Sequence, residues 1–207
     1  MQAVETEKFF AVGNNLSLDF INTDIVDNGK QIDLLEKTAD LAAWAAAMNL
    51  IEKSQAAQIV KNWSAKASDE KLLGEVRVLR RNLRELIDKI RLGAKFADLQ
   101  VEFLNDYLRK KSGGFAEIIK NENGFEKKFP VDYREPTQIF AVVAESAADL
   151  LCYANLENVK KCESKECVLY FYDVSKNHTR RWCSMTSCGN RAKAAAFYQR
   201  KKTKTSD

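Results

Sequence analysis

Residues 162–188 read CESKECVLYFYDVSKNHTRRWCSMTSC and contain four of the five cysteines of the chain. These four cysteines form two pairs, with four residues inside each pair and fifteen residues between the pairs. Zinc prefers four thiolates in a tetrahedron, and two close pairs supply them with little loss of chain entropy. The spacing therefore predicts one structural Zn²⁺ ion, bound by Cys162, Cys167, Cys183 and Cys188.

The alternative, four free thiols in an apolar core, does not suit the residues around these cysteines. Residues 163–166 are all polar, so they would not follow two flanking cysteines into a core. Cys152 lies in an apolar segment, where we expect a small core residue. His178, the only histidine, is expected in a solvent-facing turn or at a phosphate, because four thiolates complete the zinc site. Such a site has no open position for a water molecule, which argues against metal-assisted hydrolysis.

The size and composition of the chain suit one ordinary domain and a small module. It has 207 residues, of which 45% are hydrophobic and 30% charged, a balance typical of globular proteins. There is no pattern of a secretory signal and no apolar run that could span a bilayer, so we expect a cytoplasmic protein without membrane contact. In that reducing compartment, clustered cysteines indicate a metal rather than disulfides.

Positive charge is concentrated at the C-terminal end. Residues 157–207 hold twelve Lys and Arg against five Asp and Glu, a net charge of +7, whereas the whole chain carries +4 and residues 1–156 therefore carry −3. A local excess of this kind favours a polyanion as the partner. The candidate nucleic-acid contacts are Lys176, Arg180, Arg181, Arg191, Lys193 and Arg200.

The residues before the cysteines read as a mainly helical domain. Apolar residues recur at helical spacing over residues 33–49, and a second helix is expected over residues 53–65. Ser68 or Asp69 can cap a long helix that runs to about Leu92, with charges of both signs on a solvated face.

Two further helices and a hairpin are expected before the first cysteine. Residues 97–110 read as one helix, and Pro136 opens another that continues towards Asn158. Asn123-Gly124 lies between two short apolar runs, which predicts a β-hairpin.

The apolar segment over residues 15–23 is too short to assign as helix or strand. Its polar residues Asp19 and Asn22 are expected to cap a turn or a helix, and the alternative is that they line a ligand pocket.

The loop between the cysteine pairs reads as a second hairpin. Residues 168–172 favour a strand, residues 173–178 are turn-like, and residues 179–182 return the chain to Cys183. The module is too small for a core of its own, so metal binding should supply most of its folding free energy.

Three segments resemble the CGNR zinc-finger family: residues 171–177 (FYDVSKN), 180–185 (RRWCSM) and 188–193 (CGNRAK). In that family the finger follows a helical N-terminal ABATE domain, described as a stress-induced transcription regulator, and residues 18–23 (LDFINT) resemble its beginning. The resemblance covers essentially the whole chain. It implies a zinc-dependent, DNA-binding bacterial regulator with the four cysteines as ligands.

The resemblance also points to the signature Gly189-Asn190-Arg191. We expect Gly189 to allow a tight turn in which backbone N–H groups point at a ligand sulfur, and Asn190 to cap a helix that begins at Arg191. A Zn(Cys)4 centre is negative, so Arg191 or Arg181 can support it electrostatically, and for Arg191 contact with nucleic acid is an equal alternative.

We therefore predict a mainly α fold in three parts. Residues 1–157 form a helical ABATE-like domain with a small β-hairpin, which binds a small-molecule effector or forms a homodimer. Residues 158–202 form a treble-clef-like CGNR zinc finger, built from a β-hairpin and a helix, and residues 203–207 form a disordered tail.

Three functions are compatible with the basic finger. The first is a DNA-binding transcription regulator. The second is an RNA-binding protein in which Tyr170, Tyr172, Trp182 or Tyr198 stacks on unpaired bases, and the third is a protein–protein interaction module. An enzyme is the least supported class, because residues 1–156 offer no histidine, no phosphate-binding glycine loop and no nucleophile elbow.

Overall fold

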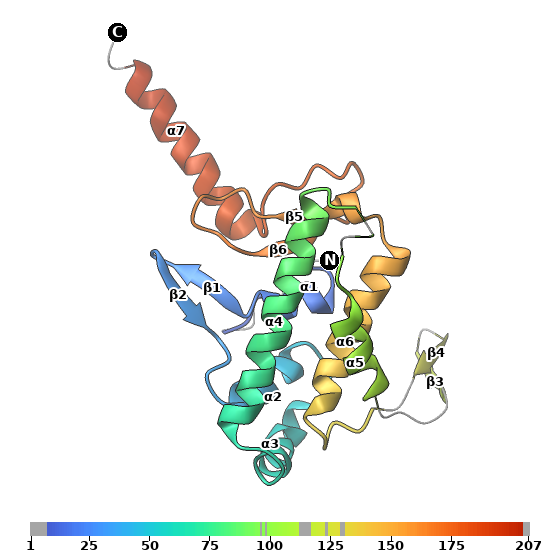
Figure 1. Ribbon diagram of the computed structural model, residues 1–207. Coiled ribbons are helices and arrows are strands. Elements are labelled where there is room, and N and C mark those ends of the chain that lie inside the picture. The colour runs from blue at the N-terminus through green and yellow to red at the C-terminus, as the bar shows by residue number, and fades with distance from the viewer. Residues whose placement is uncertain are drawn as a thin grey trace.

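The structure is a computed structural model that describes residues 8–95, 97, 99–111, 117–122, 124–128 and 131–204. Helices make up most of it, in agreement with the predicted mainly α fold (Figure 1). The α-helices are α1 (Leu16–Ile21), α2 (Thr38–Ala47), α3 (Ala56–Ser64), α4 (Asp69–Arg91), α5 (Glu102–Arg109), α6 (Thr137–Tyr153) and α7 (Asn190–Lys204). Shorter helical turns are η1 (Lys53–Gln55), η3 (Leu156–Asn158) and the π-turn η4 (Met185–Gly189).

The strands form antiparallel pairs joined by short connections. β1 (Asp24–Asp27) pairs with β2 (Lys30–Asp33), β3 (Glu117–Asn121) with β4 (Gly124–Lys128), and β5 (Val159–Lys161) with β6 (Tyr170–Tyr172). No described helix is long and apolar enough to cross a membrane.

The helical core forms around α4 and α6, which pack against each other and against α1. Ser68 caps α4 as predicted, because its side chain accepts a hydrogen bond from the backbone N–H of Lys71. The apolar face of α4 is buried, as its periodicity predicted. The largest fully buried side chains include Trp44, Trp63, Phe20 and Phe140.

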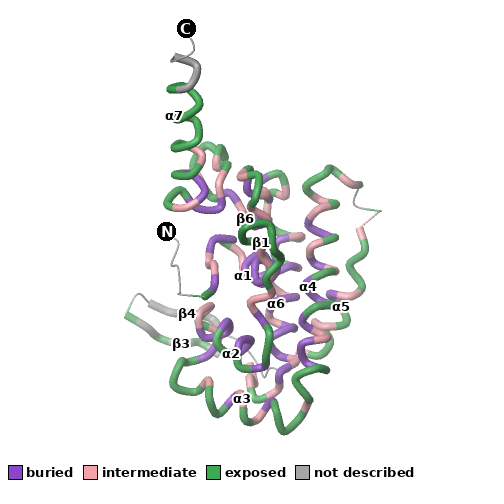
Figure 2. Tube along the Cα trace, turned by 90° about the vertical axis from the view of Figure 1, so that its left-hand side faces the viewer, coloured by how far each residue is buried: buried purple, intermediate pink, exposed green. Residues whose placement is uncertain are grey.

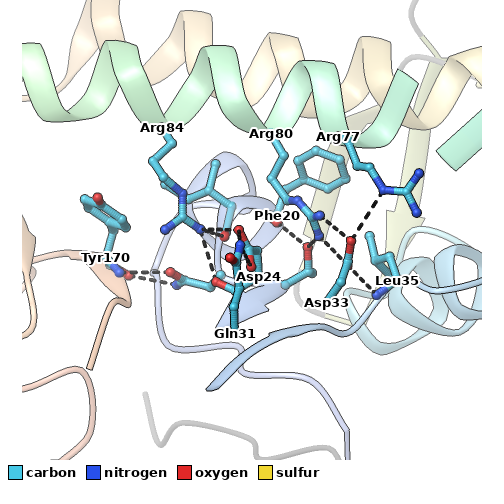
Figure 3. A network of polar contacts seen from close by, with 12 residues as sticks. Phe20, Asp24, Gln31, Asp33, Leu35, Arg77, Arg80, Arg84 and Tyr170 are labelled. Carbon is cyan, nitrogen blue, oxygen red and sulfur yellow. Dashed lines mark hydrogen bonds and ion pairs between the residues drawn. The ribbon is translucent and has the colours of Figure 1, made fainter. Parts of the chain in front are cut away.

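Two arginines of α4 do not lie on a solvated face, which corrects the expectation for this helix. Arg80 is buried and donates two hydrogen bonds to the Asp33 carboxylate, at 2.7 and 2.6 Å (Figure 3). Arg84 donates to the carbonyl oxygens of Ile21 and Asp24, at 2.9 and 3.1 Å. Arg80 and Arg84 point towards the protein because β1 and β2 carry aspartates that pair with them. These contacts fix the β1–β2 hairpin to α4.

One hairpin was predicted from its turn and one was not. β3 and β4 pair with Asn121 opposite Gly124, which confirms the hairpin expected there, although Asn123 itself lies outside the described residues. The β1–β2 hairpin turns at Asn28-Gly29, where both residues have positive φ, 48° and 76°. Asparagine and glycine tolerate this backbone conformation, so the same dipeptide signal was present at both sites.

The finger contains a β-hairpin and a helix as predicted, but the hairpin joins different residues. β6 pairs with β5, which precedes Cys162, and not with residues 179–182. The first cysteine pair therefore lies in the loop between the two strands. The segment before the cysteines had been read as the continuation of a helix, but α6 ends at Tyr153 and leaves residues 159–161 free to pair.

The β5–β6 hairpin packs into the core of the helical part. Val159 and Tyr170 are at most 2% exposed and belong to the same apolar cluster as α4 and α6. The Asn22 side chain pairs with the Tyr170 backbone in both directions: Nδ2 donates to the carbonyl oxygen and Oδ1 accepts from the N–H, each at 2.8 Å. The Tyr170 hydroxyl donates to the Asp88 carboxylate of α4. The finger is thus built onto the helices.

α7 leaves the body of the protein. Figure 2 shows it extending away from the rest of the protein, and residues 193–201 of this helix are all exposed. The helix reaches Lys204, so the first two residues of the expected tail are helical, and residues 205–207 lie outside the described residues.

Candidate metal centre

The four cysteines of the two pairs meet at one point. Their Sγ atoms all lie within 4.8 Å of one another, and three of the four residues are buried. The Cys167–Cys183 and Cys183–Cys188 sulfur separations are 3.7 and 3.6 Å. A zinc–thiolate bond of about 2.3 Å gives a tetrahedral edge of about 3.8 Å, so the spacing fits one tetrahedral ion.

Elements far apart in the sequence hold the four sulfurs in place. Cys162 and Cys167 lie between β5 and β6, and the backbone N–H of Cys162 donates to the carbonyl oxygen of Leu169 at 2.9 Å. Cys188 belongs to η4, and the backbone N–H of Cys183 points at the Cys162 sulfur, 3.4 Å away. The loop between β5 and β6 therefore contributes the first pair, and the second pair comes from the segment before η4 (Cys183) and from η4 itself (Cys188).

The crowded thiols perturb one another strongly. Hydrogen bonds from the Cys167 and Cys183 thiols lower the pKa of the Cys162 thiol well below its ordinary range. The same proximity raises the pKa of the Cys183 thiol far above its ordinary range. Sulfurs at this spacing repel one another as thiolates, and a cation at their centre offsets that repulsion. The donor set thus suits a thiophilic divalent metal.

Gly189 is required by close packing and not by an unusual backbone conformation. A Cβ atom added at this position would lie 2.9 Å from the Met185 sulfur and 3.3 Å from Cδ1 of Trp182. The Gly189 N–H donates to the carbonyl oxygen of Ser184 at 2.9 Å, so it does not point at a ligand sulfur as expected. The reason is the π-turn, whose hydrogen bonds span five residues.

Asn190 does not cap the last helix, which corrects a second expectation. Its backbone is already helical, because η4 runs directly into α7. Its side-chain Nδ2 donates back to the carbonyl oxygen of Thr186 at 3.1 Å. Ser184 is the residue in extended conformation before the turn, and its hydroxyl contacts that of Thr186 at 2.7 Å. Asn190 therefore fastens the π-turn that carries Cys188.

Two of the expected arginines contact the metal centre or its loops from the surface. Arg191 is exposed, and one of its terminal nitrogens donates to the Cys188 sulfur at 3.1 Å. Arg181 pairs with Glu163 in the first cysteine loop at 2.6 Å, and its guanidinium lies 5.1 Å from the Trp182 ring. Arg191 thus contacts a cysteine of the cluster, whereas Arg181 links the two cysteine loops.

Arg180 is largely occupied within the protein. Its guanidinium donates to the carbonyl oxygens of Trp182 and Val12, each at 3.0 Å, and to that of Cys183. It also lies 4.1 Å from the centroid of the Phe171 ring. These contacts join the N-terminal segment to the second cysteine pair.

Asp173 organises the loop between the cysteine pairs and was missed in the sequence. It is fully buried, and it accepts hydrogen bonds from Lys160 Nζ at 2.7 Å, from the Ser175 hydroxyl at 2.6 Å and from the Arg180 N–H at 2.8 Å. Burial disfavours its charge, but the bonds from Lys160, Ser175 and Arg180 hold its pKa well below the ordinary range. The signal was Asp-x-Ser, because an aspartate often accepts from the N–H two residues on.

The remaining candidate contacts lie on the exposed surface. Lys176 is exposed in the loop after β6, and Lys193 and Arg200 are exposed on α7. Arg200 Nε donates to the Ala196 carbonyl oxygen within the helix. His178 is exposed in a turn with φ of 49°, and its Nδ1 contacts the carbonyl oxygen of Asp173, which agrees with the expected turn position.

Only some of the aromatic residues considered for base stacking are exposed. Tyr170 is 1% exposed and its hydroxyl is bound to Asp88, so it belongs to the core. Tyr172 and Trp182 are half-buried. Tyr198 is 67% exposed on α7, beside Phe197 at 59%.

The N-terminal polar residues act within the fold. Asp19 is buried, and its Oδ1 accepts from the backbone N–H of Gly13 at 2.7 Å. Burial raises its pKa to about 7 although this hydrogen bond opposes the shift. Asn22 binds the backbone of Tyr170, as described above, rather than capping a helix through its side chain. Cys152 is exposed near the end of α6, so it is not the core residue expected there.

Comparison with known families agrees with this geometry. No curated protein matches the chain. The CGNR zinc-finger model matches residues 158–201, which contain the four clustered cysteines. The model of the ABATE domain, described as "Putative stress-induced transcription regulator", matches residues 14–154. Because this second match covers more than half of the chain, the protein belongs to the ABATE family, and it carries a CGNR zinc finger at its C-terminal end.

Proposed function

We propose that this protein is a zinc-dependent, DNA-binding transcription regulator. In this proposal the cysteine cluster holds one structural Zn²⁺ ion, residues 158–202 bind DNA, and residues 1–157 carry the regulatory function. The observation on which the proposal rests is α7, an exposed basic helix that begins at the metal centre.

The composition of α7 suits a polyanionic partner. Its fifteen residues, NRAKAAAFYQRKKTK, contain six Lys and Arg and no Asp or Glu. Helical spacing places Arg191 on one side and Lys193 and Arg200 on the other. A helix about 10–12 Å wide fits a major groove about 12 Å wide, and basic residues on both sides can then reach both flanking phosphate strands.

The metal centre supports this use of the helix because it fixes where α7 begins. Cys188 is a cluster member in the turn that runs into α7, and Arg191 donates to its sulfur. We assign phosphate contact to Lys193 and Arg200 and, from the surface loops, to Lys176 and Arg181. Arg191 supports the centre at its base, and the hydrogen bonds of Arg180 make it a positioning residue.

The test is a salt titration with a matched charge control. Binding of a fluorescent mixed-sequence DNA duplex is measured by anisotropy for the wild type and for Lys193→Gln/Arg200→Gln. The control is Lys53→Gln/Lys61→Gln, which removes the same charge at exposed positions of η1 and α3. If two phosphate contacts are lost, the slope of log affinity against log salt falls by about 2 only in the α7 variant. Equal losses in both variants would contradict a specific role for α7.

A second candidate is single-stranded RNA, favoured by the exposed Phe197 and Tyr198. Aromatic rings that face solvent can stack on unpaired bases, which contributes about 1–3 kcal/mol per base. Competition between duplex DNA and single-stranded RNA for the full chain separates the candidates. Loss of RNA binding in Tyr198→Ala, with duplex binding retained, would favour RNA.

A further inference from the structure

A cavity of about 320 Å³ lies between the β1–β2 hairpin and the finger. Ile25 and Ile32 are paired across the hairpin, so their side chains share a face, and together with Leu34 they form one wall. The opposite wall comes from the finger and includes Leu169. Phe10 of the N-terminal segment also lines it. The volume falls in the range of about 300–1,000 Å³ that small-molecule sites occupy.

Both walls are fixed to the same helical body, which keeps them apart. On the hairpin side, Arg80 holds Asp33 in two hydrogen bonds, and Arg84 holds the Asp24 backbone (Figure 3). On the finger side, the Asn22–Tyr170 pair anchors β6. Neither wall can move onto the other without breaking buried polar contacts. The cavity is therefore preformed, and binding there costs little reorganisation.

The exposure of Ile32 shows that the hairpin wall of the cavity is only partly covered by the rest of the protein. It is 36% exposed, although its cross-strand partner Ile25 packs against the apolar cluster that contains the cysteines. An apolar molecule placed between the hairpin and the finger would remove this surface from water, which is favourable by about 25 cal/mol for each Å² covered.

The charged residues that line the cavity are mostly acidic. Asp27 and Glu166 line it with three cysteines of the cluster, and the neutral polar residues of the lining are Asn28, Ser184 and Ser187. The single positive side chain in the lining is Arg191, whose guanidinium already donates to the Cys188 sulfur. An anionic ligand would therefore meet a negative surround, whereas a neutral or cationic donor would find acceptors.

We propose that this cavity binds a small, largely apolar molecule that is neutral or cationic and carries a hydrogen-bond donor. The ligand lies between the hairpin wall and the finger wall. Its apolar body covers Ile25, Ile32 and Leu169, and its donor faces Asp27 or Glu166. Arg191 at the start of α7 lines the cavity, whereas Lys193 and Arg200, to which phosphate contact is assigned above, do not.

The experiment uses two dyes of nearly the same shape. Phenylnaphthylamine is neutral and carries one N–H donor, and anilinonaphthalenesulfonate adds a negative charge to the same framework. Both are titrated into the full-length, metal-loaded protein, and binding is followed by dye fluorescence. The blocking variant is Ile32→Trp, because tryptophan suits a strand and fills the cavity from a half-exposed position. The control is Val78→Trp on α4, a position that is 41% exposed and does not line the cavity.

The proposal predicts one equivalent of bound phenylnaphthylamine, tighter than the sulfonate. Ile32→Trp should weaken this binding by about tenfold or more, whereas Val78→Trp should leave it unchanged. Far-UV circular dichroism of both variants checks that they remain folded.

Three results would overturn it. The first is that folded Ile32→Trp still binds phenylnaphthylamine as tightly as the wild type. The second is that the wild type binds the sulfonate more tightly than phenylnaphthylamine. The third is that the wild type sediments as a dimer and Ile32→Trp sediments as a monomer. The last result would place a second copy of the chain in the cavity.

Discussion

Replacing Asn22 with alanine should loosen the attachment of the finger to the helices. The amide of Asn22 satisfies both backbone groups of Tyr170, with two hydrogen bonds of 2.8 Å. Both residues are 1% exposed, so water has little access to the groups that the substitution leaves behind. The variant therefore removes a buried pair of hydrogen bonds at one defined point.

The size of the effect follows from the two groups that lose their partner. A buried, unsatisfied backbone group costs about 1–3 kcal/mol, so the N–H and the carbonyl of Tyr170 together cost about 4 kcal/mol. A typical domain is stable by about 5–15 kcal/mol, so this cost is a large part of its stability. For a chain of this size the melting temperature should fall by roughly 10 °C.

Urea unfolding of the metal-loaded protein, followed by circular dichroism, measures the loss. Asn14→Gly is the matched control, because Asn14 donates a single exposed hydrogen bond of 3.0 Å to the carbonyl oxygen of Tyr172. Glycine also tolerates the φ of 54° at this position. The control should lose less than about 1 kcal/mol. Equal losses in both variants would refute the claim that buried pairing through Asn22 holds the finger.

Three further predictions concern the metal centre and the N-terminal segment. Cys167→Ser should lower the zinc content per chain, measured by atomic absorption, whereas Cys152→Ser should leave it unchanged, since only Cys167 belongs to the cluster. Gly189→Ala should cost about 1–3 kcal/mol of thermal stability because its Cβ meets the Met185 sulfur at 2.9 Å, and adding Met185→Ala should restore most of the loss. Burial raises the pKa of Asp19 to about 7, so the folded state retains a proton that the unfolded state has released, and wild-type stability should fall between about pH 4 and pH 7. Asp19→Asn should remove this fall and be more stable than the wild type at pH 8 by up to about 4 kcal/mol in urea unfolding; an unchanged pH profile would show that Asp19 is not the group responsible.

The sequence predicted the features that depend on local spacing. The cysteine pairs identified the cluster, because four thiols at such intervals have one common use. Ser68 and the apolar periodicity after it predicted α4, and Asn123-Gly124 predicted the β3–β4 hairpin. Each of these signals lies within one short segment and needs no partner elsewhere.

The features that were missed depend on which other segment of the chain supplies the partner. Arg80 and Arg84 were placed on a solvated face because their aspartate partners lie about fifty residues earlier, in a hairpin that was not predicted. The charged residues of β1 and β2 obscured the apolar alternation of that hairpin. Pairing of β5 with β6 also had to compete with a nearer segment, residues 179–182. In both cases the favoured local interpretation was displaced by tertiary contacts.

The contacts of the finger bear on the expectation that metal binding supplies most of its folding free energy. Tyr170 and Val159 lie in the main core, and Asn22 holds the Tyr170 backbone, all independently of the cysteines. We therefore expect the β5–β6 hairpin to stay in place after chelation, while the turn η4 and the start of α7 lose their anchor. The spacing of the cysteines predicted which residues form the cluster. It did not predict which part of the finger is held in place by contacts with the helices.

The connection from α6 to β5 is too short to act as a flexible linker between the helical part and the finger. Ala154 and Asn155 alone separate the end of α6 from the turn η3, which continues directly into β5. A module on a flexible linker searches for its target independently, with a reach set by the length of the tether. Here the finger is joined directly to the helices, so the two parts move together. If the finger binds DNA as proposed, a change in the helices would reach DNA as a movement of the whole molecule, and two copies bound side by side would require a fixed distance between their sites.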